Sequence, residues 1–439
     1  MAMPENWIRF QETCHLVHSM VVYGDMVGSP TISTAASMTP SPNLFPNLHR
    51  LRFEGVNRGR VSAFHKEFDQ FCAVFMHAAI QEFSASFSSE LKPGIDQYAL
   101  HQTIVSISRM PMLVHLEIDS EGLNTNQLLN VIQDFQHLEN ITLPRFHLCD
   151  NVIERLSTKP FLARLTTTKN GPRDPVRLTP LELQFSDGSY RALCVITLAG
   201  NAQSIARLLR QPFFPSKLTG LHLDMQRQQS PNEVRSLLDC VVSTCGSSIK
   251  ELVFHDYDHH RHYQAPMPRT WEDIVISLDT LKPFLGCAQL TTLEIRHNYP
   301  LAFRTRDWEV VASSFPSIEN LYLNEVAHEI IPQFGHLPKL DVIAVFARHC
   351  PKLVNLGLLV EASDTKYLRG RDRWPVMALK SLSVGESYIR PHNEEAVALF
   401  LARVLSRGCQ ITSRRQRDDS GWGLVNRMVA VIFLAKQQT

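Results

Sequence analysis

The segment that decides the fold reads His349-Cys350-Pro351-Lys352-Leu353-Val354-Asn355-Leu356-Gly357-Leu358. Its leucines are separated first by two variable positions and then by one. Because successive side chains of a strand point to opposite faces, Leu356 and Leu358 enter a core while Asn355 and Gly357 face solvent. The proline ends the preceding helix and forces the turn into the strand. The segment therefore predicts a helix end, a turn and a short strand.

The same spacing of aliphatic residues recurs along the chain. Its copies begin at Leu48, Leu113, Leu138, Leu178, Leu193, Leu218, Ile249, Leu290, Ile318, Leu353 and Leu379. Steps such as 113 to 138 or 218 to 249 are close to the repeat length of about 20–29 residues expected for one strand and a returning helix. The longer steps from 48 to 113, 249 to 290 and 318 to 353 indicate insertions or a degenerate copy. The step from 178 to 193 is too short for a full unit.

Apolar residues between these copies follow helical spacing, as in 128–135, 234–241 and 342–349. Such a unit cannot bury its own apolar side chains, so successive units must stack. We therefore predict an α/β leucine-rich-repeat solenoid, with a curved parallel sheet on the concave side and helices on the convex side. Residues 1–43 are expected to form a helical cap and a Ser/Pro-rich linker, 44–390 the solenoid, and 391–439 a C-terminal helical cap.

Charge and composition argue against a nucleic-acid-binding protein and against a membrane protein. The chain has 44 basic and 43 acidic side chains, whereas a protein held on nucleic acid by phosphate contacts has a basic excess. The short basic runs at 366–373 and 414–417 are therefore expected to be solvated loops. The sequence has no membrane-spanning apolar run and no signal peptide, and its nine cysteines lack paired spacing. These features predict a soluble cytoplasmic and/or nuclear protein without a membrane or nucleic-acid partner.

Four segments carry a resemblance to a known family. They are Trp7-Ile8-Arg9-Phe10, Phe45-Pro46-Asn47-Leu48-His49-Arg50-Leu51, His349 to Leu356, and Gly421-Trp422-Gly423-Leu424-Val425. These segments resemble the leucine-rich-repeat half of F-box-type proteins of mushroom-forming (basidiomycete-type) fungi. The resemblance covers nearly the whole chain through loose motifs. It implies a right-handed solenoid that acts as a substrate receptor in a cullin-type ubiquitin ligase.

The F-box of that family is not found in this sequence. In the family it is a helical module with a Leu-Pro-rich start that docks on a Skp-type adaptor, and this chain begins where the module would have ended. Either the gene product is longer at its N-terminus, or the chain is a repeat-only scaffold without ligase association. The Skp-type adaptor is therefore expected as a partner only if an F-box is present upstream.

Sequence motifs for catalysis are not found: there is no nucleotide-binding loop, no nucleophile elbow and no His-Glu-x-x-His. We therefore expect no enzyme activity and no cofactor. One alternative is a metal-dependent hydrolase that uses His255-Asp256-Tyr257-Asp258-His259-His260-Arg261-His262, because imidazoles and carboxylates are ligands for zinc. No second cluster accompanies this run, so a solvated polar loop is the preferred interpretation and no metal site is predicted.

The predicted sheet offers a wide rigid surface rather than an enclosed pocket, which suits a protein partner. Contacts with that partner are expected from the polar side chains that flank the strand aliphatics on the concave face. These are Arg52, Glu117, Asp119, Thr142, His222, Asp224, His255, Glu294, Arg296, Tyr322 and Asn324. Tyr322 and Arg296 are of the types that most often anchor interfaces.

Overall fold

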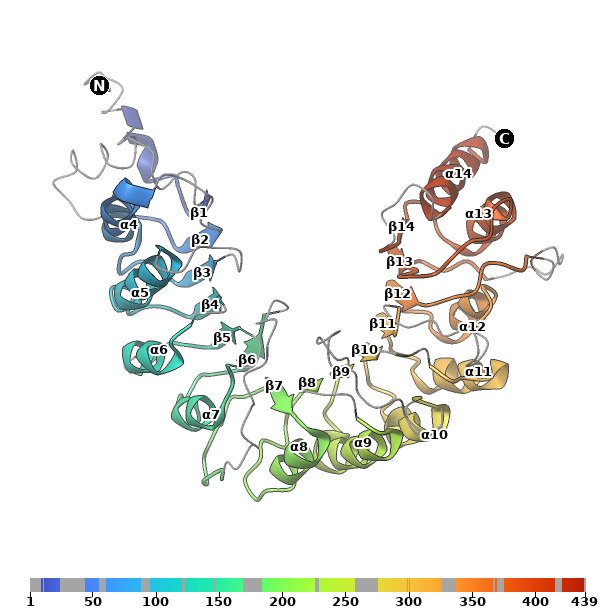
Figure 1. Cartoon of the computed structure of the whole chain (residues 1–439), viewed down its shortest axis with the longest axis horizontal. Helices are drawn as coiled ribbons and strands as arrows, with labels where there is room; N and C mark the ends of the chain where they lie inside the picture. Colours follow the sequence, from blue (N-terminus) through green and yellow to red (C-terminus); the bar gives the residue numbers. More distant parts are fainter. Residues whose placement is uncertain are drawn as a thin grey trace. The chain divides into compact units, whose positions relative to one another are not determined.

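The computed structural model describes residues 9–10, 12–23, 44–54, 61–87, 95–120, 123–133, 135–144, 147–168, 184–225, 229–256, 275–297, 299, 301–325, 337–365, 368, 375–414 and 421–437. The chain divides into two compact units, Met1–Thr197 and Leu198–Thr439. Within each unit, strands form one layer and the helices between them cover one face of it (Figure 1). We call the uncovered face of the sheet the open face.

The first unit contains short parallel strands and four described helices. The strands are β1 (Ser19–Tyr23), β2 (Arg50–Glu54), β3 (Glu82–Ser86), β4 (His115–Asp119), β5 (Asn140–Leu143), β6 (Arg164–Thr167) and β7 (Val195–Gly200), which reaches the unit boundary. The helices are α4 (Val61–Phe75), α5 (Ile95–Ile107), α6 (Thr125–Ile132) and α7 (Asp150–Leu156). Each strand pairs in parallel with the next one in chain order.

The second unit continues the alternation. Its strands are β8 (Gly220–Met225), β9 (Glu251–Asp256), β10 (Thr292–His297), β11 (Asn320–Leu323), β12 (Asn355–Leu358), β13 (Ser381–Ser383) and β14 (Gln410–Thr412). Its helices are α8 (Ala202–Leu209), α9 (Pro231–Cys245), α10 (Leu278–Leu281) with the 3₁₀ turn η2 (Lys282–Gly286), α11 (Thr305–Ser314), α12 (Val342–His349), α13 (Glu394–Val404) and α14 (Trp422–Ala435). These strands also pair in parallel and in chain order.

The register of the strands stacks equivalent leucines of successive repeats. Leu293 pairs with Leu252 on one side and Leu321 on the other, and Leu321 pairs with Leu356. All four are at most 1% exposed, and full burial of a leucine side chain is worth about 1.5–3 kcal/mol. Each leucine thus reaches its full burial only through the neighbouring repeats. The predicted α/β leucine-rich-repeat solenoid is confirmed.

Between the two predicted caps, the strands β3 and β6 were not predicted from the aliphatic spacing. In β3 the last core position is Ala85, and in β6 it is Thr167, so neither copy ends in an aliphatic residue of ordinary size. Ala85 pairs with Phe53, whose ring packs against Phe68 and compensates for the small neighbour. The step from 48 to 113 therefore contains a degenerate copy, while the copy expected at Leu178 lies outside the described residues.

Buried thiols occupy the corners between helix and strand in three repeats. Cys245 is the last residue of α9, Cys287 follows η2 and Cys350 follows α12, and none of the three is more than 4% exposed. Burial raises the pKa of the Cys245 and Cys350 thiols to about 12. They therefore stay protonated at neutral pH and act as small apolar side chains.

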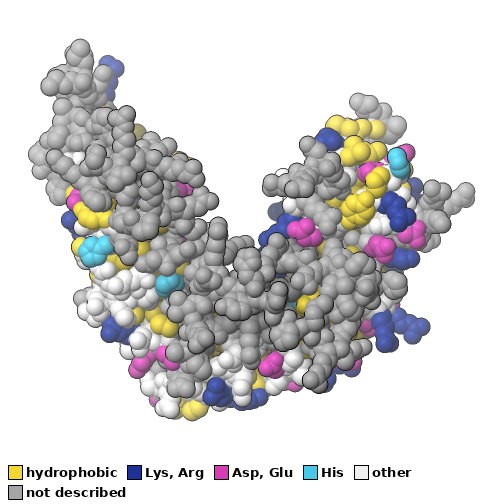
Figure 2. Space-filling model, viewed as in Figure 1, with side chains coloured by type: hydrophobic (Ala, Val, Ile, Leu, Met, Phe, Trp, Pro, Cys, Tyr) yellow, Lys and Arg dark blue, Asp and Glu magenta, His cyan; other side chains and the backbone are white. Residues whose placement is uncertain are grey.

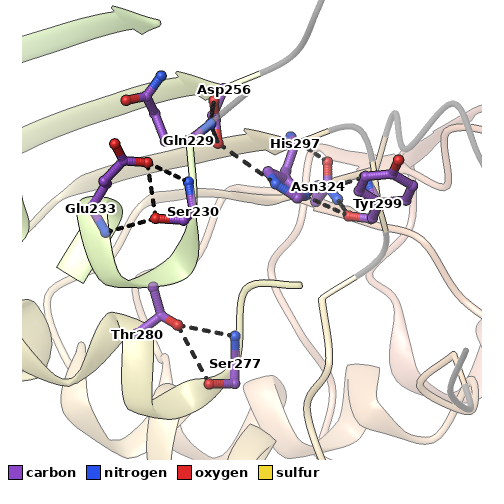
Figure 3. Close-up of polar contacts among 9 residues, drawn as sticks. All are labelled: Gln229, Ser230, Glu233, Asp256, Ser277, Thr280, His297, Tyr299 and Asn324. Atoms are coloured by element: carbon purple, nitrogen blue, oxygen red, sulfur yellow. Dashed lines mark hydrogen bonds and ion pairs between the residues drawn. The ribbon is translucent and has the colours of Figure 1, made fainter. Parts of the chain in front are cut away.

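Buried polar side chains tie strand ends of the second unit to the preceding repeat. Four times, a side-chain oxygen accepts the backbone N–H of a residue 27 positions earlier. The donor and acceptor pairs are Ala202 and Gln229, Gln229 and Asp256, His297 and Asn324, and Val360 and Ser387. Figure 3 shows Gln229 beside Asp256 and Asn324 beside His297. We call these four hydrogen bonds the buried ladder. Leaving such a buried group unpaired would cost about 1–3 kcal/mol, so the buried ladder fixes where these strands end.

Helix α9 begins with a capping box that the sequence encodes locally. The Ser230 hydroxyl accepts the Glu233 backbone N–H, and the Glu233 carboxylate accepts the Ser230 backbone N–H at 2.8 Å (Figure 3). Pro231 takes the first helical position, where its missing N–H costs nothing. The box fixes the start of α9 directly after the ladder residue Gln229.

The sheet extends into both ranges predicted as caps, because β1 pairs with β2 and β14 pairs with β13. Helix α14 buries Trp422, whose indole N–H donates to the carbonyl oxygen of Ser387 at 3.0 Å. Its other side leaves Leu424, Val431 and Leu434 more than 40% exposed. Figure 2 shows apolar side chains gathered in this region of α13 and α14.

Two glycines with positive φ provide a matched test of the packing between repeats. Gly385 (φ +49°) follows β13, and a Cβ there would lie 1.5 Å from the carbonyl oxygen of Glu325; Gly408 (φ +86°) has open space around it. Both alanine substitutions impose the left-handed penalty of about 1–2 kcal/mol. We expect Gly385→Ala to lower the free energy of unfolding by about 2–4 kcal/mol more than Gly408→Ala does, since the backbone at Gly385 or Glu325 must move to admit the Cβ. Urea unfolding followed by circular dichroism measures the difference, and equal losses would refute the close approach.

Candidate functional site

The sequence-predicted contact residues of the first unit are spread along the open face. Arg52 on β2 forms an ion pair with Glu54 at 2.8 Å, and its side chain is 58% exposed. Thr142 on β5 shares a hydrogen bond with Thr166 on β6 at 2.9 Å. The Thr142 contact is local, whereas the charge of Arg52 reaches Glu117 two strands away and helps to lower the pKa of that carboxyl.

Glu117 and Asp119 lie on β4. A hydrogen bond with His115 lowers the pKa of Glu117, which therefore carries its charge at neutral pH. Asp119 ends the strand and accepts a hydrogen bond from the Thr168 hydroxyl at 2.8 Å. That bond holds the chain after β6 against β4, so Asp119 has a structural role besides its predicted place on the face.

In the second unit, five charged or titratable side chains from four neighbouring repeats meet on the open face. They are Asp224 (β8), His255 (β9), Glu294 and Arg296 (β10) and Glu325 (after β11), which we call the polar cluster. The side chains are between 6% and 18% exposed. Their order along the face follows from the strand register, in which Asp224 pairs with His255 and His255 with Arg296.

His255 bridges three strands through both of its ring nitrogens. Nδ1 lies 3.1 Å from Oδ1 of Asp224, and Nε2 lies 3.0 Å from Oε1 of Glu294. Two carboxylate neighbours favour the imidazolium form, in which both nitrogens donate. Burial alone would lower the pKa of His255, but the hydrogen bonds and charges of Asp224 and Glu294 outweigh it and raise the pKa above its ordinary value.

Glu294 is the centre of the cluster. Its Oε1 accepts from His255 and also forms a close ion pair with Nε of Arg296. Burial alone would raise the pKa of Glu294, but His255 and Arg296 lower it to about 2. Glu294 is therefore ionised across the physiological range.

Arg296 also reaches toward Glu325, whose Oε1 lies 3.7 Å from Nη2 of Arg296. The other oxygen, Oε2 of Glu325, is buried and accepts no hydrogen bond. Burial raises the pKa of Glu325, and the opposing charge of Arg296 is too weak to cancel that effect. The cluster thus contains one carboxylate that is charge-paired but incompletely hydrogen-bonded.

A row of hydrogen bonds borders the cluster on the same face. His222 on β8 lies 2.9 Å from Glu251 on β9, between Nε2 and Oε1. Further along the row, the Asn320 amide donates to Thr292, and the Asn355 amide donates to Asn320 at 2.6 Å. These contacts fix the orientation of the polar side chains beside the polar cluster.

Tyr322 on β11 lies over β12 at Gly357. A Cβ at Gly357 would lie 2.4 Å from Cδ1 of the Tyr322 ring and 3.3 Å from the Glu325 carboxylate. Glycine at this position therefore makes room for the ring. Burial raises the pKa of the Tyr322 phenol, and the charges of Glu294 and Glu325 raise it further. Both carboxylates therefore lie near the phenol.

The predicted place of Asn324 on the solvent-facing side is wrong. Its side chain is 1% exposed, and its amide accepts the His297 backbone N–H at 2.8 Å and donates to the carbonyl oxygen of Tyr299 at 2.6 Å (Figure 3). The strand ends at Leu323 and Asn324 has a φ of +56°, so strand alternation no longer applies. Glu325, which the sequence reasoning missed, takes the place on the open face.

The predicted alternative of a metal site within 255–262 can be examined only at its first two residues, because 257–262 lie outside the described residues. His255 faces the open side, whereas Asp256 is fully buried and accepts the Gln229 backbone N–H. The two cannot bind one ion together. Throughout the described ranges, no three His, Cys, Asp or Glu side chains are placed to hold a metal ion.

Comparisons with known proteins leave the function open. No family model matches the sequence, and no curated protein matches it. A solved structure, the crystal structure of a TLR13–ssRNA13 complex, is similar with a TM-score of 0.37 and 12% sequence identity. The match covers 92% of this chain and 52% of that one, so this chain spans about half the length of that protein. The fold therefore rests on the strand order and register described above.

One further property concerns membranes. Among the described helices, none is both long and apolar enough to cross a bilayer.

The geometry around His255 predicts a pH-dependent stability. Folding raises the pKa of His255 above its ordinary value of about 6.5. The contribution of His255 to the free energy of unfolding is therefore complete below about pH 6.5, and it is lost as the pH rises through the raised pKa of the folded state. We expect His255→Asn to lower the free energy of unfolding more at about pH 6 than at about pH 9. Urea titrations over this range provide the measurement.

The matched control for this experiment is His137→Asn, at an exposed turn position before β5. No hydrogen bond or ion pair joins His137 to another described residue, so its replacement is expected to have the same small effect at every pH. A His255→Asn effect that is independent of pH would show that the imidazolium bridge does not form.

Proposed function

We propose that this chain is an interaction protein that binds a protein partner through the open face, centred on the polar cluster and Tyr322. The observation that carries the proposal is the fixed geometry of the polar cluster, whose side chains come from several repeats and hold one another by hydrogen bonds and ion pairs. Ordering a long side chain on binding costs about 0.5–1.5 kcal/mol, and here much of that cost is met during folding. Tyr322 and Arg296 are of residue types enriched at interface anchors.

The arrangement favours binding over catalysis. A general base needs a free ring nitrogen within reach of its substrate, and both nitrogens of His255 face carboxylates. The carboxylates of Asp224, Glu294 and Glu325 would also repel phosphate groups, which favours a protein over a nucleic acid at this face. We therefore propose a non-enzymatic protein that acts without a cofactor.

We extend the proposal to a substrate receptor like the recognition half of an F-box protein in a cullin-type ubiquitin ligase. The segments at 7–10, 45–51, 349–356 and 421–425 motivate this extension. The alternative is a repeat-only scaffold that binds its partner without the ligase.

A partner-binding experiment tests the open face. The chain is used as bait in cells that express it, the captured partner is purified, and its affinity is measured by calorimetry. Tyr322→Ala is expected to weaken binding about tenfold or more, because it removes the aromatic surface at the centre of the face. The matched control is Val310→Ala on α11, 42% exposed on the helical side. Equal affinities for the wild type and both variants would exclude this face.

A second experiment separates the ligase version from the scaffold version. The gene product, with any upstream coding sequence included, is mixed with a purified fungal Skp-type adaptor and analysed by size-exclusion chromatography. Co-elution that depends on an upstream F-box is expected for the ligase version. If none of the natural transcript products co-elutes with the adaptor, the ligase version is wrong and the scaffold version remains.

A further inference from the structure

Helix α14, the last described element of the second unit, is apolar on two opposite faces. Its inner face, which packs against α13 and β14, buries Trp422, Val425 and Val429. Its outer face leaves Leu424 44% and Val431 63% exposed, in the region where Figure 2 shows apolar side chains gathered. The end of a solenoid needs a polar outer surface, and a helix that is apolar all round is normally covered on every side. The outer face of α14 is therefore expected to be covered by another surface.

The outer face follows the spacing of a coiled-coil seam. Leu424, Met428, Val431 and Ala435 are separated by steps of four, three and four residues, which is the spacing of the d and a positions of two heptads. Met428 is half-buried, and the other three are exposed. We call these four residues the outer seam. Because side chains with this spacing interdigitate with those of another helix, the covering surface is expected to be helical.

Hydrogen bonds at both ends hold α14 in place. At its start, the Trp422 indole N–H donates to the carbonyl oxygen of Ser387 at 3.0 Å. Just after its end, the Lys436 ammonium group donates to the carbonyl oxygen of Ala402 on α13 at 2.8 Å. The outer seam thus lies on a helix that is already ordered, so the docking of a second helix requires little further ordering of α14.

The outer seam is complementary to itself in the antiparallel orientation. A two-fold axis through the middle of α14 places Leu424 of one copy opposite Ala435 of the other. The same axis places Met428 opposite Val431. Each larger side chain therefore faces a smaller one, which is the arrangement that fills the space between two helices without voids. Under this symmetry one surface supplies both sides of the contact, so a second copy of the chain is a suitable occupant.

The charges of α14 favour the antiparallel orientation. The only charged residue within the helix is Arg427, and Leu434 lies seven residues further along on the same side of the outer seam. In the antiparallel pair the two Arg427 side chains lie about 7.5 Å apart along the helix axis, whereas a parallel pair would place them at the same level. A lipid surface is a weaker alternative, because a single arginine attracts anionic headgroups only weakly.

We propose that α14 is a self-association surface, at which two copies of the chain pair through their outer seams in antiparallel orientation. This surface differs from the open face, so the inference goes beyond the proposed function and is tested without the protein partner. Two heptads are short for a stable interface, which buries about 1,200–2,000 Å². A dissociation constant of about 1–100 µM is therefore expected.

Sedimentation velocity of the whole chain tests self-association over about 1–200 µM, which brackets the expected dissociation constant. The wild type is expected to shift from 49.9 kDa toward twice that mass as its concentration rises. Val431→Lys is expected to weaken association about tenfold or more, because it places an unpaired charge in the seam. The matched control is Val310→Lys on α11, which is 42% exposed on the helical side and should associate like the wild type.

Two results of this experiment would overturn the proposal. One is a wild type that stays monomeric over the whole range. The other is a Val431→Lys variant that associates as tightly as the wild type, because the contact would then lie elsewhere.

Paired charge changes test the orientation. Leu424→Lys and Ala435→Glu alter exposed positions, so both variants are expected to fold, which thermal unfolding followed by circular dichroism checks. Each variant alone is expected to lose self-association, since it brings a charge into the contact. An equimolar mixture is expected to recover association, because the introduced lysine faces the introduced glutamate only in the antiparallel pair. Failure of two folded variants to recover association on mixing would overturn the proposal.

The same variants identify a different occupant of the outer seam. A monomeric wild type that co-sediments with phosphatidylcholine–phosphatidylserine vesicles, and loses this property in Val431→Lys, would make a lipid surface the occupant. A monomeric wild type whose captured protein partner binds less tightly to Val431→Lys would make that partner the occupant. Either result would overturn self-association and leave the test of the open face unchanged.

Discussion

The structure depends on the burial of leucines that no single repeat can remove from water. Each strand is short and contributes few core side chains, and residues such as Leu321 are buried because Leu293 and Leu356 lie at the paired positions of the neighbouring strands. Stability is therefore shared between adjacent repeats, in the manner of a one-dimensional stack. This requirement sets the register, and the register brings polar side chains of different repeats into contact.

The polar cluster is a consequence of that register combined with the way the strands end. The buried ladder, in which Asn324 accepts the His297 backbone N–H, ends β11 and turns the chain so that Glu325 enters the open face. Gly385, with its close approach to the Glu325 carbonyl oxygen, leaves space for that turn. Gly357 leaves space for Tyr322 in the same way. The chemistry of the face is thus positioned by backbone geometry beneath it.

Sequence reasoning recovered the fold because the aliphatic spacing has a direct physical cause in strand alternation. It failed at β3 and β6, where the small Ala85 and the polar Thr167 stand at the third position of the repeat in place of an aliphatic residue. It placed His255, Glu294 and Arg296 on the open face, where the structure brings them together. It misplaced Asn324 and missed Glu325, because alternation ends when the backbone adopts positive φ, and it could not show which side chains from different repeats become neighbours.

The most direct test of the account is a double-mutant cycle between His255 and Glu294, which are 39 residues apart in sequence and 3.0 Å apart in the structure. His255→Asn, Glu294→Gln and the double variant are unfolded in urea at about pH 6, where the imidazolium is populated. If stacked repeats hold the two side chains together, the cycle gives a favourable coupling of about 1–3 kcal/mol. Additivity within about 0.5 kcal/mol would contradict the account, because the polar cluster would not exist as a unit.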